Sequence, residues 1–91
     1  MTYLEEIKGL RDEINKLNEE IIVKLAARVA TAEAIAKVKR QYGKPIRDAV
    51  RERAVLQSVR NQAVAHGLDP NGVEKAFQAI IDLCVEAEKR Q

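Results

Sequence analysis

Two cations of this sequence, Arg28 and Lys39, occur at helical spacing on what is otherwise an apolar face. On a helical wheel both fall within about 40° of Ile14, and Arg11 falls about 60° from it. An unpaired cation buried on such a face costs on the order of several kcal/mol, so each needs an acidic partner, a route to solvent, or an anionic ligand. For a single cation, an ion pair or a solvated end is the commoner outcome. Three on one stripe weaken that explanation but do not overturn it.

A second set of residues shares one helix face, at positions i, i+3, i+4 and i+7: Asp48, Arg51, Glu52 and Val55. The simplest interpretation is an N-terminal cap followed by solvated charges. A third apolar stripe ends at Glu88, four residues after Cys84. A carboxylate in the last turn of a helix is unfavourable to the helix dipole. From the sequence alone we therefore expect Glu88 to be frayed and solvated rather than buried.

The residue types argue against covalent catalysis, phosphate-loop binding, base stacking and metal binding. The chain has no nucleophile with a partnered base, no glycine-rich phosphate loop and no aromatic stacking surface. With one cysteine, Cys84, and one histidine, His66, it has neither an intrachain disulfide nor a set of zinc ligands. We expect no metal and no cofactor, and an enzyme built on these residues would work without covalent chemistry.

Helices must position these residues, because aromatic residues are only 3% of the chain and the apolar set is mostly Ala, Leu, Ile and Val between charged residues. From Leu4 to Gln41 there is no proline and one glycine, so about 38 residues can form one helix. It ends where Gly43 and Pro45 follow. Its apolar stripe comprises Ile7, Leu10, Ile14, Leu17, Ile21, Leu25, Ala32 and Ile35.

Two shorter helices account for the remaining sequence. One is predicted over residues 48–65, with Asp48 as its N-cap and Gly67 just beyond its end. The other is predicted over residues 69–89, with Asp69 as its N-cap and a proline as its first helical residue. Its inner face holds Val73, Phe77, Ile80, Ile81, Cys84 and Val85. The sequence thus predicts an all-α fold of three helices in a single domain, residues 1–91.

The first helix is too long for such a domain. About 38 residues span roughly 57 Å, whereas a compact chain of this length has a diameter near 30 Å. Its apolar stripe continues along the whole length, so the overhanging part needs a second chain to bury it. We expect an intertwined homodimer.

The formal net charge is +2, so the whole chain is not a polycation suited to nucleic acid. The segment 37–53 is nevertheless strongly basic, which indicates an anionic partner nearby. No apolar run approaches the roughly 20 residues of a membrane span, and the first residues do not resemble a signal peptide. We expect a cytoplasmic protein that binds neither nucleic acid nor membrane.

Short runs in order along nearly the whole chain resemble one family. They are LRDEI (10–14), LAAR (25–28), KVK (37–39), PIRD (45–48), RER (51–53), HGLD (66–69) and FQAII (77–81). This combination is similar to the all-helical, AroQ-type chorismate mutases. The resemblance implies an intertwined homodimer of three-helix chains and an isomerase that converts chorismate to prephenate, in the shikimate pathway to phenylalanine and tyrosine.

The resemblance also implies roles for individual residues. Arg11 of one chain and Arg28 of the other would bind the two carboxylates of the substrate, and Lys39 would contact a carboxylate and the ether oxygen. Glu52 and the backbone of Asp48 would hold the ring hydroxyl. Arg51 would support that side, and the remaining candidates are the apolar walls Ile35, Val55, Ile81 and Val85. Cys84 replaces a small polar residue that is common in relatives.

Helix geometry fits these roles. Arg28 and Lys39 lie about 16.5 Å apart along one helix, a gap that two long side chains and a small dianion can close. Arg11 lies about 25 Å from Arg28, so it can reach the same ligand only from a partner chain. Glu88 stands where most bacterial relatives carry a glutamine that donates to the ether oxygen. An ionised glutamate only accepts hydrogen bonds, so Glu88 would serve only when protonated.

Two other functions remain open at this point. An isochorismate pyruvate lyase has the same fold and cationic site, and the spacing alone does not separate it from a mutase. A different class is a dimeric helical module that binds nucleic acid or an acidic partner through residues 37–53.

Overall fold

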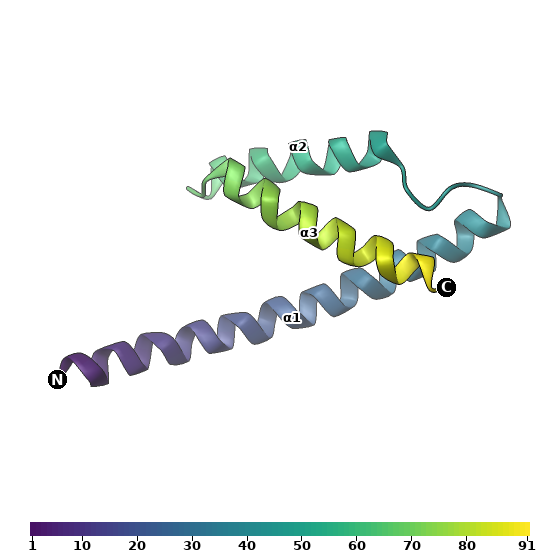
Figure 1. The fold of residues 1–91 in the computed structure, drawn as a ribbon. Helices are drawn as coiled ribbons and strands as arrows, with labels where there is room; N and C mark the ends of the chain where they lie inside the picture. Colours follow the sequence, from purple (N-terminus) through teal and green to yellow (C-terminus); the bar gives the residue numbers. More distant parts are fainter.

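A computed structural model describes residues 1–91, which form three helices and no strand. Helix α1 spans Tyr3–Gln41, α2 spans Ala49–Ala65 and α3 spans Pro70–Lys89 (Figure 1). The all-α prediction is confirmed, and the predicted helix ends agree closely with these bounds.

Each helix begins at a side chain that satisfies free backbone N–H groups of the first turn. Thr2 caps α1 in a capping box with Glu5, whose amide donates to the threonine hydroxyl at 3.2 Å. Asp48 caps α2 by accepting from the amide of Arg51 at 3.1 Å, as predicted. Asp69 caps α3 ahead of a proline in the first turn. These local signals explain why the boundaries could be predicted from the sequence.

The first two helices end at glycines in the left-handed backbone region. Gly43 follows α1 with φ of 64°, and Gly67 follows α2 with φ of 71°. A side chain at either position would be strained, so glycine is the residue that allows the chain to turn there.

Helix α3 packs against both other helices, whereas α1 and α2 do not pack on each other. The core is small, since only nine of the 91 residues are buried. Its apolar members are Ala32, Ala36, Val59, Ala63, Ile81, Cys84, Val85 and Ala87. The core therefore lies where α3 meets each neighbour, and the N-terminal part of α1 extends away from it (Figure 1).

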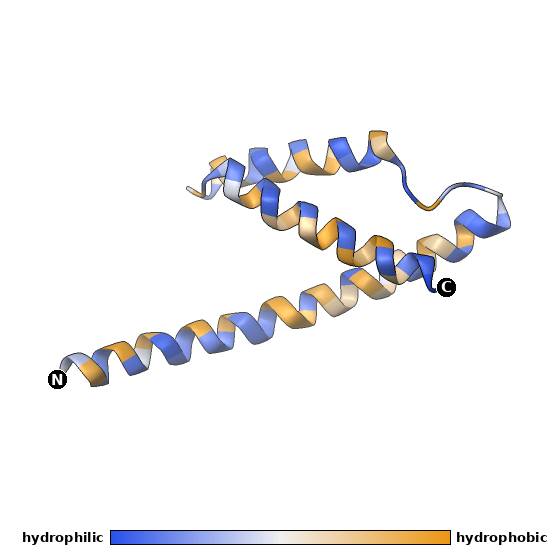
Figure 2. Cartoon of the chain, in the orientation of Figure 1, coloured by the Kyte–Doolittle hydropathy of each residue, from blue (hydrophilic) through white to orange (hydrophobic).

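The chain is elongated, measuring 61 × 26 × 15 Å with a radius of gyration of 17.2 Å. A compact chain of this length has a radius of gyration near 12 Å. Hydrophobic residues recur along the projecting part of α1 (Figure 2), and Leu10, Ile14 and Ile21 are each more than half exposed. This stripe is unpartnered within one chain. No helix is both long enough and apolar enough to cross a membrane.

Candidate active site

A cavity of about 400 Å³ lies among the three helices and the segment between α1 and α2. This volume is in the usual range for small-molecule sites. Its walls are formed by Arg28, Thr31, Ala32, Ile35, Lys39, Ile46, Asp48, Arg51, Glu52, Val55, Ile81, Cys84, Val85 and Glu88. The structure thus brings together every predicted site residue except Arg11.

Helix α1 supplies five lining residues at helical spacing, from Arg28 to Lys39. Thr31 and Ala32 are among them although the sequence interpretation did not select them. Their spacing from Arg28 could have identified them as neighbours on the same face. The Thr31 hydroxyl donates to the backbone oxygen of Ala27 at 3.0 Å, so its proton is already used within the helix.

Arg28 is partly buried and reaches across to α3. Its Nη1 donates to Cys84 Sγ at 2.9 Å. A sulfur is a weak acceptor, and a guanidinium carries five N–H donors. A carboxylate entering the cavity would be a stronger partner for these donors than the thiol is.

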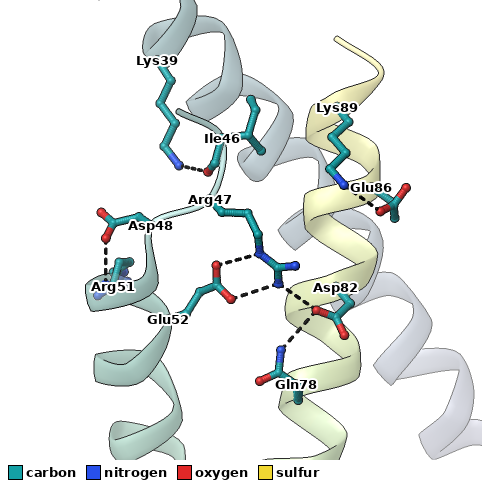
Figure 3. A network of polar contacts seen from close by, with 10 residues as sticks. All are labelled: Lys39, Ile46, Arg47, Asp48, Arg51, Glu52, Gln78, Asp82, Glu86 and Lys89. Atoms are coloured by element: carbon teal, nitrogen blue, oxygen red, sulfur yellow. Dashed lines mark hydrogen bonds and ion pairs between the residues drawn. The ribbon is translucent and has the colours of Figure 1, made fainter. Parts of the chain in front are cut away.

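The charged end of Lys39 also lies inside the cavity. Its Nζ donates to the backbone oxygen of Ile46 (Figure 3) and lies 3.9 Å from Glu88 Oε2. Only 24% of the side chain is exposed. Of the two common outcomes for a cation on an apolar stripe, Lys39 therefore shows the ion pair, with Glu88, and not the solvated end. Ile46 precedes α2, and no spacing rule could have paired it with Lys39.

The expectation that Glu88 is solvated is wrong. Glu88 is only 8% exposed, and its Oε2 is buried without a hydrogen-bond partner. The last turn of α3 is held against α1, because Arg40 Nη2 donates to the Glu88 backbone oxygen at 3.2 Å and Gln91 donates to the carboxylate of Glu33. These contacts join residues far apart in sequence, so the sequence pattern gave no signal for them.

The α2 side of the cavity carries Glu52, whose carboxylate is bound by Arg47 at both oxygens. The Nε to Oε2 distance is 3.1 Å and the Nη2 to Oε1 distance is 3.0 Å (Figure 3). The same Nη2 donates to Asp82 Oδ1 on α3 at 2.9 Å. The hydrogen bond from Arg47 lowers the pKa of Asp82. The hydrogen bonds that Arg47 donates raise its own pKa, the larger effect coming from Glu52 and the smaller from Asp82.

These pairings decide the charge that the cavity offers a ligand. Glu52 is paired with Arg47, which lies outside the lining. The other charged lining residues are three cations, Arg28, Lys39 and Arg51, and two carboxylates, Asp48 and Glu88. With Glu52 paired, the cavity offers a surplus of positive charge beside apolar walls, an arrangement suited to a small anionic ligand.

Comparison with known proteins assigns the chain to a protein family. A family model described as chorismate mutase type II matches residues 10–89. The chain belongs to this family. It is 30% identical over 79 residues to the chorismate mutase of Methanocaldococcus jannaschii, a match that covers 87% of this chain and 80% of that protein. The resemblance identified from the short sequence runs is confirmed.

Longer relatives share the same region. The T-protein of Haemophilus influenzae is 38% identical over 78 residues, which cover 86% of this chain and 21% of that protein. The bifunctional chorismate mutase/prephenate dehydratase of Escherichia coli K12 is 34% identical over 82 residues, which cover 90% of this chain and 21% of that protein. The chain thus spans about a fifth of the length of these two relatives.

One predicted residue of this chorismate mutase type II chain lies outside the cavity. Arg11 is exposed on the projecting part of α1 and does not line the site. It precedes Arg28 by about 25 Å of continuous helix. No rearrangement of side chains within one chain can bring the two guanidinium groups onto one small ligand.

Proposed function

We propose that this chain is a chorismate mutase, an isomerase that converts chorismate to prephenate in the synthesis of phenylalanine and tyrosine. The observation that carries the proposal is one cavity, in a chain of this family, that places Arg28, Lys39 and Glu88 around apolar walls. Chorismate is a small dianion, which matches the surplus of positive charge.

Binding is proposed to rest on the cations. Arg28 exchanges its bond to Cys84 for one carboxylate of the substrate, and Lys39 contacts a carboxylate from the other end of the cavity. Ile35, Val55 and Val85 press the two reacting arms together between apolar surfaces. Holding a compact conformer supplies much of the acceleration of an intramolecular rearrangement.

Charge stabilisation is proposed to rest on Lys39 and Glu88. As the C–O bond breaks, negative charge grows on the ether oxygen, and donors aimed there are worth more in a dry cavity than in water. Lys39 Nζ and Glu88 Oε2 lie 3.9 Å apart, so one oxygen atom can contact both. Glu88 donates only in its protonated form.

The ring hydroxyl is proposed to bind on the α2 side. The hydroxyl donates a hydrogen bond to the carboxylate of Glu52, and the backbone of Asp48 adds a second contact. Arg51 supports this side of the cavity. Ile81 and Cys84 complete the wall that α3 provides.

A homodimer is proposed to complete the site. The exposed stripe of α1 requires an apolar partner, and a second copy of the chain offers the same stripe. Pairing of the two stripes would carry Arg11 of each chain to the cavity of the other. This would supply a further cation that a single chain cannot bring there.

The test is chorismate depletion by purified protein, followed by identification of the product. Prephenate supports the proposal. Pyruvate formed from isochorismate, with no prephenate from chorismate, would make the chain a lyase instead. Strongly salt-dependent binding of DNA without either activity would favour an interaction module.

A further inference from the structure

Arg47 lies outside the lining of the cavity but is bonded to a residue that forms it. It lies in the segment between α1 and α2. Its Nη2 and Nε donate to the two carboxylate oxygens of Glu52, at 3.0 and 3.1 Å (Figure 3). The third contact, 2.9 Å to Asp82 Oδ1, extends to α3. Gln78 Nε2 donates to the same Asp82 oxygen at 3.1 Å. One guanidinium therefore connects a loop and two helices beside the site.

The geometry of this contact fixes the direction of a carboxylate. A planar guanidinium that donates to both oxygens aligns the two groups in one plane, which a single-point cation such as lysine does not do. A carboxylate has about four lone-pair sites, so two remain for a ligand after Arg47 has used two. Glu52 has 21% of its side chain exposed, and it lines the cavity.

We propose that Arg47 is a positioning residue, which holds Glu52 in the orientation that accepts a hydrogen bond from a hydroxyl group of the substrate. This inference rests on the proposed function. Arg47 does not touch the substrate itself. Its contribution is to remove the freedom that the Glu52 side chain would otherwise lose on binding.

The position of Glu52 predicts which kinetic constant responds. The hydroxyl contact is proposed at Glu52 and the backbone of Asp48, whereas the breaking bond is proposed to contact Lys39 and Glu88, and all four residues line the cavity. A contact of this kind binds the ground state and the transition state equally. Loss of Arg47 should therefore raise KM and leave kcat nearly unchanged.

The experiment compares Arg47→Gln, Arg47→Lys, Glu52→Gln and the double variant Arg47→Gln/Glu52→Gln, with Arg53→Gln as the matched control. Arg53 is an exposed arginine of α2 outside the cavity lining. We expect Arg47→Gln to raise KM about tenfold with kcat within about twofold. Arg47→Lys should recover only part of the loss, because lysine keeps the charge but not the planar pair of donors.

The double variant separates positioning from a general structural role. If Arg47 acts through Glu52, its removal adds little once Glu52→Gln is present. Full additivity in the double variant would overturn the proposal. So would complete rescue by Arg47→Lys, or an equal rise in KM for Arg53→Gln. Circular dichroism on each variant establishes that the helices are retained.

A measurement independent of activity distinguishes failure of this inference from failure of the proposed function. Side-chain ¹³C NMR of Glu52 should report one rotamer in the unmodified chain and in Arg53→Gln, and an average over rotamers in Arg47→Gln. If the unmodified chain has no mutase activity but shows this difference, the proposed function fails and the positioning stands. Equal averaging in all three proteins would overturn the positioning whatever the activity.

Discussion

Lys39 is proposed both to bind a carboxylate of the substrate and to stabilise the charge on its ether oxygen. Its Nζ lies between the backbone oxygen of Ile46 and the carboxylate of Glu88. We expect Lys39→Ala to lower kcat by about 10²-fold or more, because the lost donor faces an oxygen that gains negative charge in the transition state. KM should change less than kcat.

Steady-state kinetics with chorismate checks this prediction, with Lys37→Ala as the control. Lys37 is an exposed lysine of the same helix and does not line the cavity. A change confined to KM would reduce Lys39 to an anchor for a substrate carboxylate.

Glu88 provides a second test at the scale of one residue. Its buried Oε2 has no hydrogen-bond partner, and the charged group beside it is Lys39 at 3.9 Å, with Arg28 also lining the cavity. A glutamine is a donor at every pH, whereas a glutamate donates only when protonated. We therefore expect Glu88→Gln, which places a permanent donor beside Lys39, to have a kcat at least equal to that of the unmodified chain at neutral pH.

The measurement is kcat for chorismate with both proteins at neutral pH in the same buffer, with Glu88→Ala as a third variant. Glu88→Ala removes the side-chain group and should lower kcat, because no donor then lies beside Lys39. Equal kcat in Glu88→Gln and Glu88→Ala would mean that this position does not donate to the substrate.

At the scale of the helix, Arg40 on α1 holds the C-terminal turn of α3. Its bond to the Glu88 backbone oxygen brings a cation to the negative end of the helix dipole. We expect Arg40→Ala to loosen this turn by about 1 kcal/mol, the typical worth of one such hydrogen bond. That corresponds to roughly fivefold faster amide exchange in the last turn.

Hydrogen exchange of the amides of residues 86–90 checks this expectation. In Lys37→Ala, which removes an exposed cation from the same helix, exchange should stay unchanged. Equal exchange in both variants would show that other contacts keep Glu88 buried.

The helices also show what the sequence could and could not predict. Capping residues and glycines act within a few positions, so the bounds of all three helices were predictable. The helical spacing of Arg28 and Lys39 likewise placed them on one wall of the cavity. No local pattern specifies how the helices pack. The hydrogen bonds from Arg47 to Glu52 and Asp82 depend on that packing, and so does the burial of Glu88.

At the scale of the whole molecule, each active site of the proposed dimer is formed by residues of both chains. The 61 Å extent of the chain and the exposed stripe of α1 leave a single chain with a small core and two arginines that cannot meet. If each site takes Arg28 from one chain and Arg11 from the other, Arg11→Ala and Arg28→Ala should each be nearly inactive. Each variant removes a cation from both sites of its own homodimer.

Refolding an equal mixture of the two variants should restore about a quarter of the unmodified activity. Half of the dimers are then mixed, and two-fold symmetry leaves each mixed dimer with one intact site and one site that lacks both cations. Sedimentation should give a mass about twice the 10.2 kDa of one chain, and differently tagged chains establish that mixed dimers are present. If mixed dimers form but activity is not recovered, the two arginines do not serve a shared site. An active species of 10.2 kDa would show that activity does not require a dimer.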